Sequence, residues 1–541
     1  MVTESAEGLS KKHRSRFLGH FKDTWYDTPD IGVVWHVEEY KMLNSVDFSG
    51  RPFHFIGIGG IGMSALAYVL TQQRLPVSGS DLRLSHITQR LQEAGAHIFW
   101  RQEADNLSFF EQGFEQGLTA NYSDHSPVKL AARQTVNLPQ VVCSTAINES
   151  NDEYRAALKM GCPIFHRSDL LAALMKQYKS IAVAGTHGKT TTSSMMGYAL
   201  LEGGIDPTMV VGGEVSAWEG NARLGMSNWF VAEADESDGS LVKLTPEIGI
   251  ITNIELDHPD HYNSLEDVVD IFRQFSQQTK TVIASIDCAT VRSFLNPDIT
   301  YSVEVGNPAD YTVTDVVYSA TGTRAAVWER GNHLGVLRLA VPGKHNLSNA
   351  LAVIAAGRCV GVDFDALAAG LAQFEGARRR FERRGFYSGI QFVDDYAHHP
   401  SEIKATLSTA RLLKEADVRL GHGVKRIFAI FQPHRYSRTA AFLDDFAQAF
   451  NDADEVIITD VYGAGEEKPK GFSAQVVARA IAEYHPHVQY CSTLEAVSAV
   501  LTERLQPGDM ALFLGAGNLN RIIPEVMEPF VNAEIQAVQQ A

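Results

Sequence analysis

The chain has 541 residues, too many for a single hydrophobic core, and this length predicts about three or four domains. Its hydrophobic fraction of 45% and aromatic fraction of 9% are those of an ordinary globular protein. The formal net charge of −17 argues against a general affinity for nucleic acid or for an anionic membrane, because either partner would repel the chain.

The cysteines and the N-terminal residues indicate the cellular compartment of the protein. The five cysteines lie far apart without a Cys-x-x-Cys pair, so they indicate neither a disulfide framework nor a cysteine zinc site, and we expect a cytoplasmic protein. Residues 1–16 are polar where a signal peptide needs an apolar stretch, and no segment holds about 18 consecutive apolar residues, so no membrane partner is expected. Residues 1–50 lack periodicity and are expected to form an extension, partly disordered or lying over a neighbouring domain. The sequence indicates no oligomeric state.

From residue 52 onward, short apolar runs rich in β-branched residues alternate with helix-length segments, which is typical of parallel sheets joined by crossover helices. Three such stretches follow in series, so the predicted fold class is α/β with three consecutive domains, at 51–176, 177–383 and 384–541. Residues 117–138 are polar and aperiodic and are expected to form a surface insertion. The strand-like runs are 53–56, 141–143, 180–183, 229–232, 248–251, 390–393, 427–431, 456–458 and 510–514.

A first glycine-rich turn follows the strand-like run 53–56 and precedes a helix-like run at 63–70. Its glycines are Gly57, Gly59, Gly60 and Gly62, and the acidic Asp81 lies about 20 residues further on. This pattern is that of a dinucleotide-binding turn, in which Asp81 would contact a ribose hydroxyl. The same geometry binds other sugar diphosphates, because the physical basis is backbone N–H groups and a helix dipole facing negative oxygens.

A second glycine-rich turn follows the strand-like run 180–183 and precedes a helix-like run at 192–201. Backbone N–H groups at a helix N-terminus attract anions, glycines allow close approach, and a lysine adds a full charge. The turn has two residues between its first glycine and the Gly-Lys pair where the common phosphate-binding loop has four, so we interpret it as a shortened variant. It consists of Gly185, Thr186, His187, Gly188, Lys189, Thr190 and Thr191.

Candidate ligands for Mg²⁺ stand at two strand ends near this loop. Thr190 follows the loop lysine, and Glu233 follows the strand-like run 229–232, where a carboxylate reaches the crevice in which α/β sheets bind ligands. His258 lies in a polar loop after the run 248–251. A solvated acidic loop and a capping histidine are the structural alternatives. One further element has a purely structural interpretation: Ser264 is a candidate N-cap for an amphipathic helix at 265–278.

Seven ordered motifs resemble those of the Mur ligases of bacterial cell-wall synthesis, over nearly the whole chain from residue 51. They lie at 57–62, 185–192, 233–240, 252–261, 343–346, 394–400 and 431–438. The resemblance implies an N-terminal domain for a UDP-sugar, a central ATPase and a C-terminal domain for the incoming amino acid. It also implies ATP-dependent joining of L-alanine to UDP-N-acetylmuramic acid through an acyl phosphate, with Mg²⁺, and it assigns the first loop to the UDP diphosphate.

The resemblance also implies roles for individual residues. Lys189 would hold the β- and γ-phosphates, Thr190 and Glu233 one Mg²⁺, and His258 a second. The charge and position of the basic run at 378–384 separately predict that Arg380 contacts ATP, with a solvated linker as the alternative. By resemblance, Asn253, His345 and Asn346 would lie near the nucleotide, and Tyr396, His398, His399, Arg435 and Arg438 would line the amino-acid and acyl-phosphate site. Arginine suits that site because its planar fork can grip a carboxylate or phosphate with two hydrogen bonds.

Three alternatives stay open at this point. A ligase that adds a preformed tripeptide to the same sugar would share every motif, although the uninterrupted first glycine turn favours the alanine enzyme. An NAD-dependent oxidoreductase would account for the segment from Gly57 to Asp81. A regulatory nucleotide switch would account for the second loop but leaves the clusters at 394–400 and 431–438 unexplained.

Overall fold

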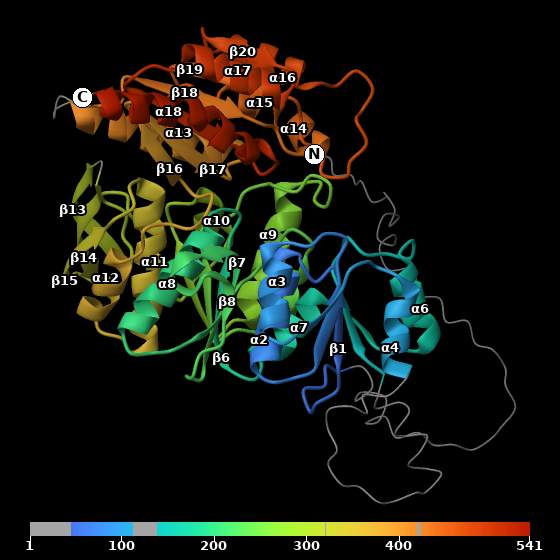
Figure 1. Cartoon of the computed structure of the whole chain (residues 1–541). Coiled ribbons are helices and arrows are strands. Elements are labelled where there is room, and N and C mark those ends of the chain that lie inside the picture. Colours follow the sequence, from blue (N-terminus) through green and yellow to red (C-terminus); the bar gives the residue numbers. More distant parts are fainter. Residues whose placement is uncertain (1–44, 112–137, 320, 419–422, 541) are drawn as a thin grey trace, which may run out of the picture. The chain divides into compact units, whose positions relative to one another are not determined.

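The computed structural model describes residues 45–111, 138–319, 321–418 and 423–540. The chain divides into two units, Met1–Ser45 and Val46–Ala541, and every element below belongs to the second. The predicted extension at 1–50 and the predicted insertion at 117–138 lie almost entirely outside the described residues. Within the second unit, three sheets follow one another along the chain, coloured blue, green to yellow, and orange to red in Figure 1.

The first sheet is entirely parallel, with the strand order β3-β2-β1-β4-β5. Its central strand is β1 (Phe53–Ile56), of which every residue is buried. Three of its four side chains are apolar, which suits a parallel strand covered on both faces, and the fourth is the buried His54. The other strands are β2 (Val77–Ser80), β3 (His97–Phe99), β4 (Gln140–Cys143) and β5 (Ile164–His166). The helices are α2 (Ile61–Gln72), α3 (His86–Glu93), the 3₁₀ turn Ala104–Leu107, α4 (Ser108–Glu111), α6 (Asp152–Met160) and α7 (Arg167–Met175).

The second sheet has ten strands in the order β15-β14-β13-β12-β11-β10-β6-β9-β7-β8. The strands from β12 across to β7 are parallel, whereas β8 pairs antiparallel with β7, and β13, β14 and β15 form an antiparallel meander. The strands are β6 (Lys179–Ala184), β7 (Thr208–Val215), β8 (Gly220–Arg223), β9 (Trp229–Glu233), β10 (Ile248–Ile251), β11 (Thr281–Ser285), β12 (Ile299–Tyr301), β13 (Tyr311–Ser319), β14 (Gly322–Glu329) and β15 (Asn332–Leu339).

Helices α8 (Lys189–Glu202) and α11 (Lys344–Val360) lie side by side against this sheet (Figure 1). Their apolar side chains join those of β6 and β10 in one buried cluster that includes Met195, Leu351, Val183 and Ile250. This packing fixes the amino end of α8 at the edge where β6 and β10 end. The remaining helical segments are Ser216–Trp218, Ser240–Lys243, α9 (Leu265–Gln278), α10 (Ala289–Phe294) and α12 (Phe364–Ala372).

The third sheet has six strands in the order β16-β17-β21-β18-β19-β20 and is parallel except for β16. The strands are β16 (Glu382–Tyr387), β17 (Ile390–Asp395), β18 (Arg426–Phe431), β19 (Glu455–Thr459), β20 (Val488–Cys491) and β21 (Asp509–Leu514). The helical segments are α13 (Pro400–Val418), α14 (Tyr436–Ala441), α15 (Leu443–Ala447), α16 (Ala474–Ala482), α17 (Leu494–Arg504), Leu519–Ile522 and α18 (Ile523–Gln540).

The α/β class is confirmed, and each strand-like run named from the sequence lies within a strand. The predicted helix at 265–278 is α9, and Ser264 caps it as expected: its hydroxyl accepts the Asp267 N–H at 3.3 Å, and the Asp267 carboxylate accepts the Ser264 N–H at 3.0 Å. The domain boundaries at 51–176, 177–383 and 384–541 stay predictions.

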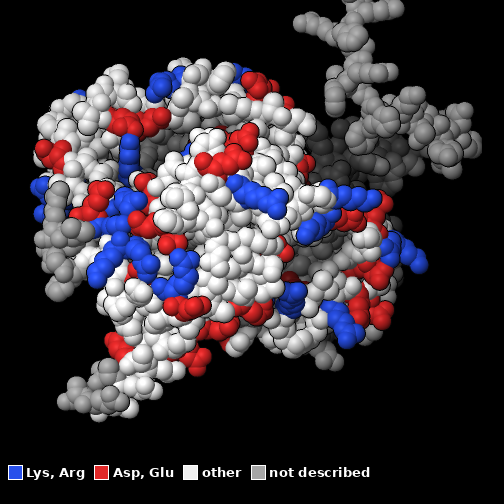
Figure 2. Space-filling model, turned by 90° about the horizontal axis from the view of Figure 1, so that it is seen from above, with Lys and Arg blue, Asp and Glu red and all other residues white. Residues whose placement is uncertain are grey.

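Within the described ranges, no helix is both long enough and apolar enough to cross a membrane. On the face drawn in Figure 2, acidic and basic side chains are interspersed rather than separated into areas of one sign.

Candidate active site

The phosphate-binding loop predicted at 185–191 joins the end of β6 to the start of α8. Gly188 is the residue that caps α8 and has a φ of +86°, a conformation that favours glycine. Asn253 holds the loop in place: its side chain accepts the His187 N–H at 2.8 Å and donates to the His187 carbonyl at 3.1 Å. Because Gly188 carries no capping side chain, the positive end of the α8 dipole remains available to an anion.

Lys189 folds back over this loop. Its ammonium group donates to the carbonyl oxygen of Gly185 at 2.7 Å and to that of Thr186 at 3.1 Å, and it also contacts Glu236. Burial opposes the lysine charge, but Glu236 and Asp235 raise its pKa above the ordinary value. The lysine therefore stays protonated at the position where phosphates would meet the loop.

The predicted metal ligands line one cavity. The Thr190 hydroxyl lies 3.0 Å from the Glu233 carboxylate, which also accepts the Gly212 N–H at 2.7 Å. Burial raises the pKa of Glu233 and lowers that of His258, so a cation entering here would favour ionisation of the carboxylate while the imidazole is already neutral. Hydroxyl and carboxylate oxygens are donors that Mg²⁺ prefers, and these side chains fit such an ion.

Two cavities adjoin at the loop. The first, of about 500 Å³, is lined by predicted nucleotide residues, and the second, of about 860 Å³, is lined by the predicted metal and amino-acid residues. The first cavity contains His187, Gly188, Thr191, Asn253, His345, Asn346 and Arg380. The second contains Thr186, Lys189, Thr190, Glu233, His258, Tyr396, His398, Arg435 and Arg438. The three residues that line both are His187, Arg380 and Glu402.

The third sheet supplies cations and neutral histidines to the second cavity. Arg438 and Asp257 form a buried pair at 2.7 Å; burial opposes ionisation, but Arg438 holds the pKa of Asp257 well below its usual range. Burial lowers the pKa of His398 to about 4 and that of His434 to about 3. Both imidazoles are therefore neutral near pH 7. Arg435 reaches back to Asp260 at 2.6 Å, which joins the third sheet to the loop after β10.

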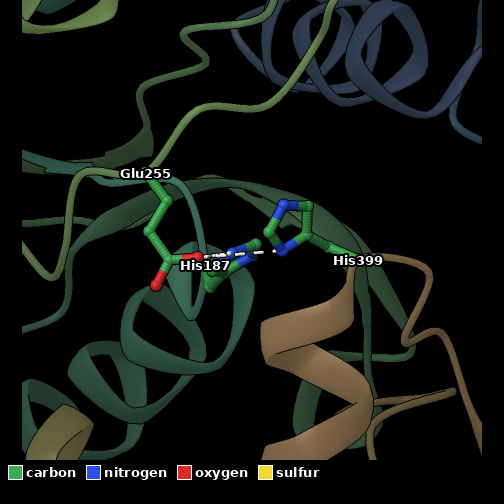
Figure 3. A group of neighbouring side chains, drawn as sticks. All are labelled: His187, Glu255 and His399. Carbon is green, nitrogen blue, oxygen red and sulfur yellow. Dashed lines mark hydrogen bonds and ion pairs between the residues drawn. The ribbon is translucent and has the colours of Figure 1, made fainter. Parts of the chain in front are cut away.

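His187, Glu255 and His399 form a cluster between the phosphate-binding loop and the start of α13 (Figure 3). Among the described residues, these are the side chains whose atoms lie close enough together to suit a metal ion. However, both ring nitrogens of His187 face carboxylates, Glu255 at 3.2 Å and Glu402 at 3.4 Å. Burial would lower the pKa of His187, yet these two partners raise it to about 10. The cluster is thus an ion-pair network around a protonated histidine.

The resemblance placed His399 in the amino-acid and acyl-phosphate site. Its ring lies against those of His187 and Phe442, at centroid distances of 4.8 and 5.0 Å, and it lines neither cavity. A direct role for His399 stays a prediction.

The first glycine loop joins β1 to α2 as predicted. The Asp81 carboxylate accepts the N–H of Gly59 at 2.9 Å and that of Arg83 at 3.0 Å, so it lies on the loop itself. Ile61, one residue before Gly62, lines the second cavity, and Asn221 of β8 donates to Ser64 of α2 at 3.0 Å. The end of the first loop therefore borders the second cavity; the roles of Gly57, Gly59, Gly60, Gly62 and Asp81 toward a substrate stay predictions.

Sequence reasoning missed several acidic residues of the site. Glu236, Glu255, Asp257 and Glu402 lie within or beside the motifs that carried the prediction, but no role was assigned to any of them. Each pairs with a residue that the sequence did single out: Glu236 with Lys189, Glu255 with His187, Asp257 with Arg438, and Glu402 with Arg380. Glu402 had a usable signal, since a glutamate in the first turn of a helix can reach back to cap it.

These features define an α/β enzyme that uses a nucleotide at a phosphate-binding loop. Three family models match consecutive parts of the chain: the Mur ligase family catalytic domain at 52–179, the Mur ligase middle domain at 183–357, and the Mur ligase glutamate ligase domain at 379–517. The chain belongs to the Mur ligase family.

Individual relatives are similar over most of their length. The UDP-N-acetylmuramate–L-alanine ligase of Nostoc punctiforme is 62% identical, with 90% of this chain and 98% of the relative covered. The crystal structure of the UDP-N-acetylmuramate-alanine ligase of Thermotoga maritima is 29% identical over 89% of this chain and 99% of that one, with a TM-score of 0.71. A murein peptide ligase of Psychrobacter arcticus, 23% identical over 89% and 99% of the two chains with a TM-score of 0.60, shares the fold.

Proposed function

We propose that this chain joins L-alanine to the lactyl carboxylate of UDP-N-acetylmuramic acid in peptidoglycan precursor synthesis, with conversion of ATP to ADP and phosphate. The observation that carries the proposal is the meeting of two cavities at one phosphate-binding loop, with nucleotide residues on one side and arginines and neutral histidines on the other. The 62% identity to a ligase named for this reaction supports the choice of substrates. The cytoplasm is the proposed location, where free thiols persist.

The chemistry follows from the poor leaving group of a carboxylate. An oxygen of the lactyl carboxylate attacks the γ-phosphorus of ATP, the bond to the β-phosphate oxygen breaks, and ADP leaves. The amine of L-alanine then attacks the carbonyl carbon of the acyl phosphate, inorganic phosphate departs, and the nitrogen loses a proton. Both steps build negative charge that positioned cations must stabilise.

The residues of the loop would serve the first step. Lys189 would hold the β- and γ-phosphates, because its ammonium already lies over the loop, and the N-terminus of α8 would face the same oxygens. Arg380 would contact the phosphates from the other side, since it lines both cavities. Asn253 would act indirectly, by fixing the backbone of His187.

The third sheet would serve the second step. Arg435 and Arg438 carry forked guanidinium groups suited to the carboxylate of L-alanine or to the acyl phosphate. His398 and His434 line the same cavity and are neutral near pH 7, so they add no positive charge that would repel an incoming amine. The guanidinium carbons of Arg379 and Arg380 lie 4.9 and 5.2 Å from the centroid of the Tyr396 ring, and these cation–π contacts help to orient the three side chains.

Magnesium is the metal that this donor set fits. Thr190 and Glu233 would hold one ion beside the phosphates, and His258 a second; when bound, they offset the charge of the transferring phosphoryl group. The UDP diphosphate is assigned to the first glycine loop, whose end borders the second cavity.

The test is ADP release by the purified protein with ATP, Mg²⁺ and UDP-N-acetylmuramic acid, comparing L-alanine, the cell-wall tripeptide and no acceptor. Release that depends on L-alanine supports the proposal. Release with the tripeptide alone would instead assign the chain to precursor recycling, and no release with either acceptor would refute ligase activity.

A further inference from the structure

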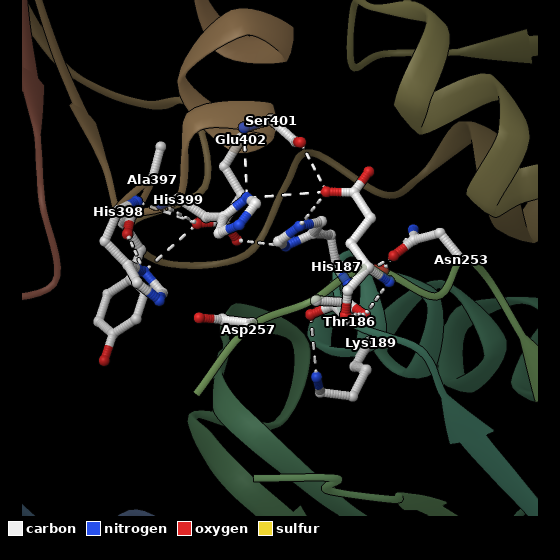
Figure 4. Close-up of polar contacts among 12 residues, drawn as sticks. Thr186, His187, Lys189, Asn253, Asp257, Ala397, His398, His399, Ser401 and Glu402 are labelled. Atoms are coloured by element: carbon white, nitrogen blue, oxygen red, sulfur yellow. Dashed lines mark hydrogen bonds and ion pairs between the residues drawn. The ribbon is translucent and has the colours of Figure 1, made fainter. Parts of the chain in front are cut away.

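Glu402 lies in the first turn of α13, and its two carboxylate oxygens face opposite sides of the site (Figure 4). One oxygen accepts the backbone N–H of His398 at 2.9 Å and that of His399 at 3.3 Å. The other lies 3.4 Å from Nδ1 of His187 and 3.5 Å from a guanidinium nitrogen of Arg380. A single side chain thus contacts the phosphate-binding loop, an arginine near the nucleotide, and the start of a helix from the third sheet.

The contacts of Glu402 connect the two cavities. His187, Arg380 and Glu402 are the residues common to the linings of both cavities, and Glu402 contacts the other two. His398 lines only the second cavity, and its ring nitrogen Nδ1 lies 3.3 Å from the Glu402 oxygen that caps the helix. Glu402 therefore lies at the boundary that the two cavities share.

The Glu402 carboxylate and the phosphates of a bound nucleotide would compete for the same cationic side chains. Phosphate oxygens that enter the loop would attract the same two cations, His187 and Arg380, that the Glu402 carboxylate contacts. When these cations turn toward phosphate, the carboxylate keeps only its contacts with His398 and His399 and strengthens them, since an anion follows its remaining partners. The position of the His398 ring in the second cavity then depends on what occupies the first.

We propose that Glu402 is a positioning residue that couples nucleotide occupancy of the first cavity to the placement of His398 for the amino-acid step. The inference rests on the proposed function and deepens it, because it links the nucleotide site to the amino-acid site through one side chain. A simple helix cap would need only one of the two carboxylate oxygens.

Glu402→Gln separates the two roles. A glutamine in the first turn of a helix keeps an acceptor oxygen for the N–H groups of His398 and His399, so the cap survives. Its NH₂ group replaces the oxygen that faced His187 and Arg380, and both cations are released toward the phosphates. Glu415→Gln makes the same chemical change at an exposed position of the same helix and serves as the matched control.

The measurement is the Kd of ADP by titration calorimetry with saturating UDP-N-acetylmuramic acid, with and without L-alanine, a mixture in which no turnover occurs. In the wild type and in Glu415→Gln, L-alanine is expected to tighten ADP binding by roughly fivefold or more. In Glu402→Gln this ratio falls to about one, ADP alone binds several-fold more tightly, the KM for L-alanine rises, and Tm stays within about 2 °C of wild type.

The opposite changes in nucleotide and alanine affinity are the signature that a purely structural role would not produce. Parallel weakening of both ligands with a fall in Tm, an unchanged ratio in Glu402→Gln, or no coupling in the wild type would each overturn the inference. Failure of the proposed function itself is separate, since it appears as a wild type that releases no ADP in response to L-alanine.

Discussion

The ammonium group of Lys189 lies 2.7 Å from a carboxylate oxygen of Glu236, and the two side chains are only 14% and 3% exposed. Burial raises the pKa of Glu236 to about 7, although the neighbouring ammonium works against this. The pair keeps the lysine charged and in place over the phosphate-binding loop. Removing the lysine would leave a buried carboxyl group that is costly to ionise.

Lys189→Ala is therefore expected to have two separable effects. ADP release falls at least about 100-fold, because the charge that offsets the transferring phosphoryl group is gone. The free energy of unfolding falls by roughly 3 kcal/mol, because Glu236 loses its partner. Assays of ADP release and urea unfolding measure both. The double variant Lys189→Ala/Glu236→Gln should recover the stability but not the turnover, and near-normal turnover of Lys189→Ala would show that the lysine is not the phosphate clamp.

Thr190 offers a nearly isosteric test of the metal assignment. Thr190→Val removes the hydroxyl that lies 3.0 Å from Glu233 but keeps the branched shape, whereas Thr190→Ser keeps the hydroxyl. We expect the valine variant to need at least about tenfold more Mg²⁺ for half-maximal ADP release, and the serine variant to stay within about threefold of wild type. EDTA should abolish release in all three proteins. Equal Mg²⁺ requirements for valine and serine would remove Thr190 from the metal site.

Much of the fold could be predicted because parallel strands buried on both faces read as continuous apolar runs. β1, β6, β10 and β18 are of this kind. The meander β13–β15 was not predicted: its strands mix buried with exposed residues and carry charges such as Arg324 and Arg338, so they lack the apolar run that marked the predicted strands.

The site was predictable where chemistry resides in a local motif, and not where it depends on contacts across the fold. The loop at 185–191 carries its glycines and lysine in one short segment. Glu236 and Glu402 become meaningful only when the fold places them beside Lys189 and His187, which are distant in the chain. No spacing rule connects such residues, so their partnership could be seen only in three dimensions.

The cluster around His187 predicts a particular dependence of stability on pH. Burial opposes the charge of His187, but the carboxylates of Glu255 and Glu402, which accept hydrogen bonds from its ring, raise its pKa to about 10; its other titratable neighbour is His399. Since the folded pKa exceeds the ordinary value of 6.5, the native state binds the extra proton between these values. The stabilisation is therefore complete below pH 6.5 and is lost as the pH rises toward 10.

His187→Gln removes this contribution, so the stability difference between wild type and variant should be largest near pH 6 and shrink by pH 9.5. Urea unfolding at both pH values measures it. His333→Gln, at an exposed position in β15, is the control and should show no such trend. A difference that grows with pH would mean that His187 is neutral in the folded protein.

A last prediction concerns a polar network in the core of the first sheet, away from both cavities. His54 of β1 and Glu153 of α6 are fully buried and lie 2.8 Å apart, and the same carboxylate accepts hydrogen bonds from Asn106 at 2.8 Å and from Ser80. Glu153→Ala would leave three donors without their acceptor, so we expect the free energy of unfolding to fall by about 3 kcal/mol.

Turnover per folded molecule, measured well below the unfolding temperature, should stay within about twofold of wild type, because Glu153 lines neither cavity. Thermal unfolding together with the ADP assay separates the two effects, and a stable variant that has lost turnover would place this network in the catalytic pathway instead of the core.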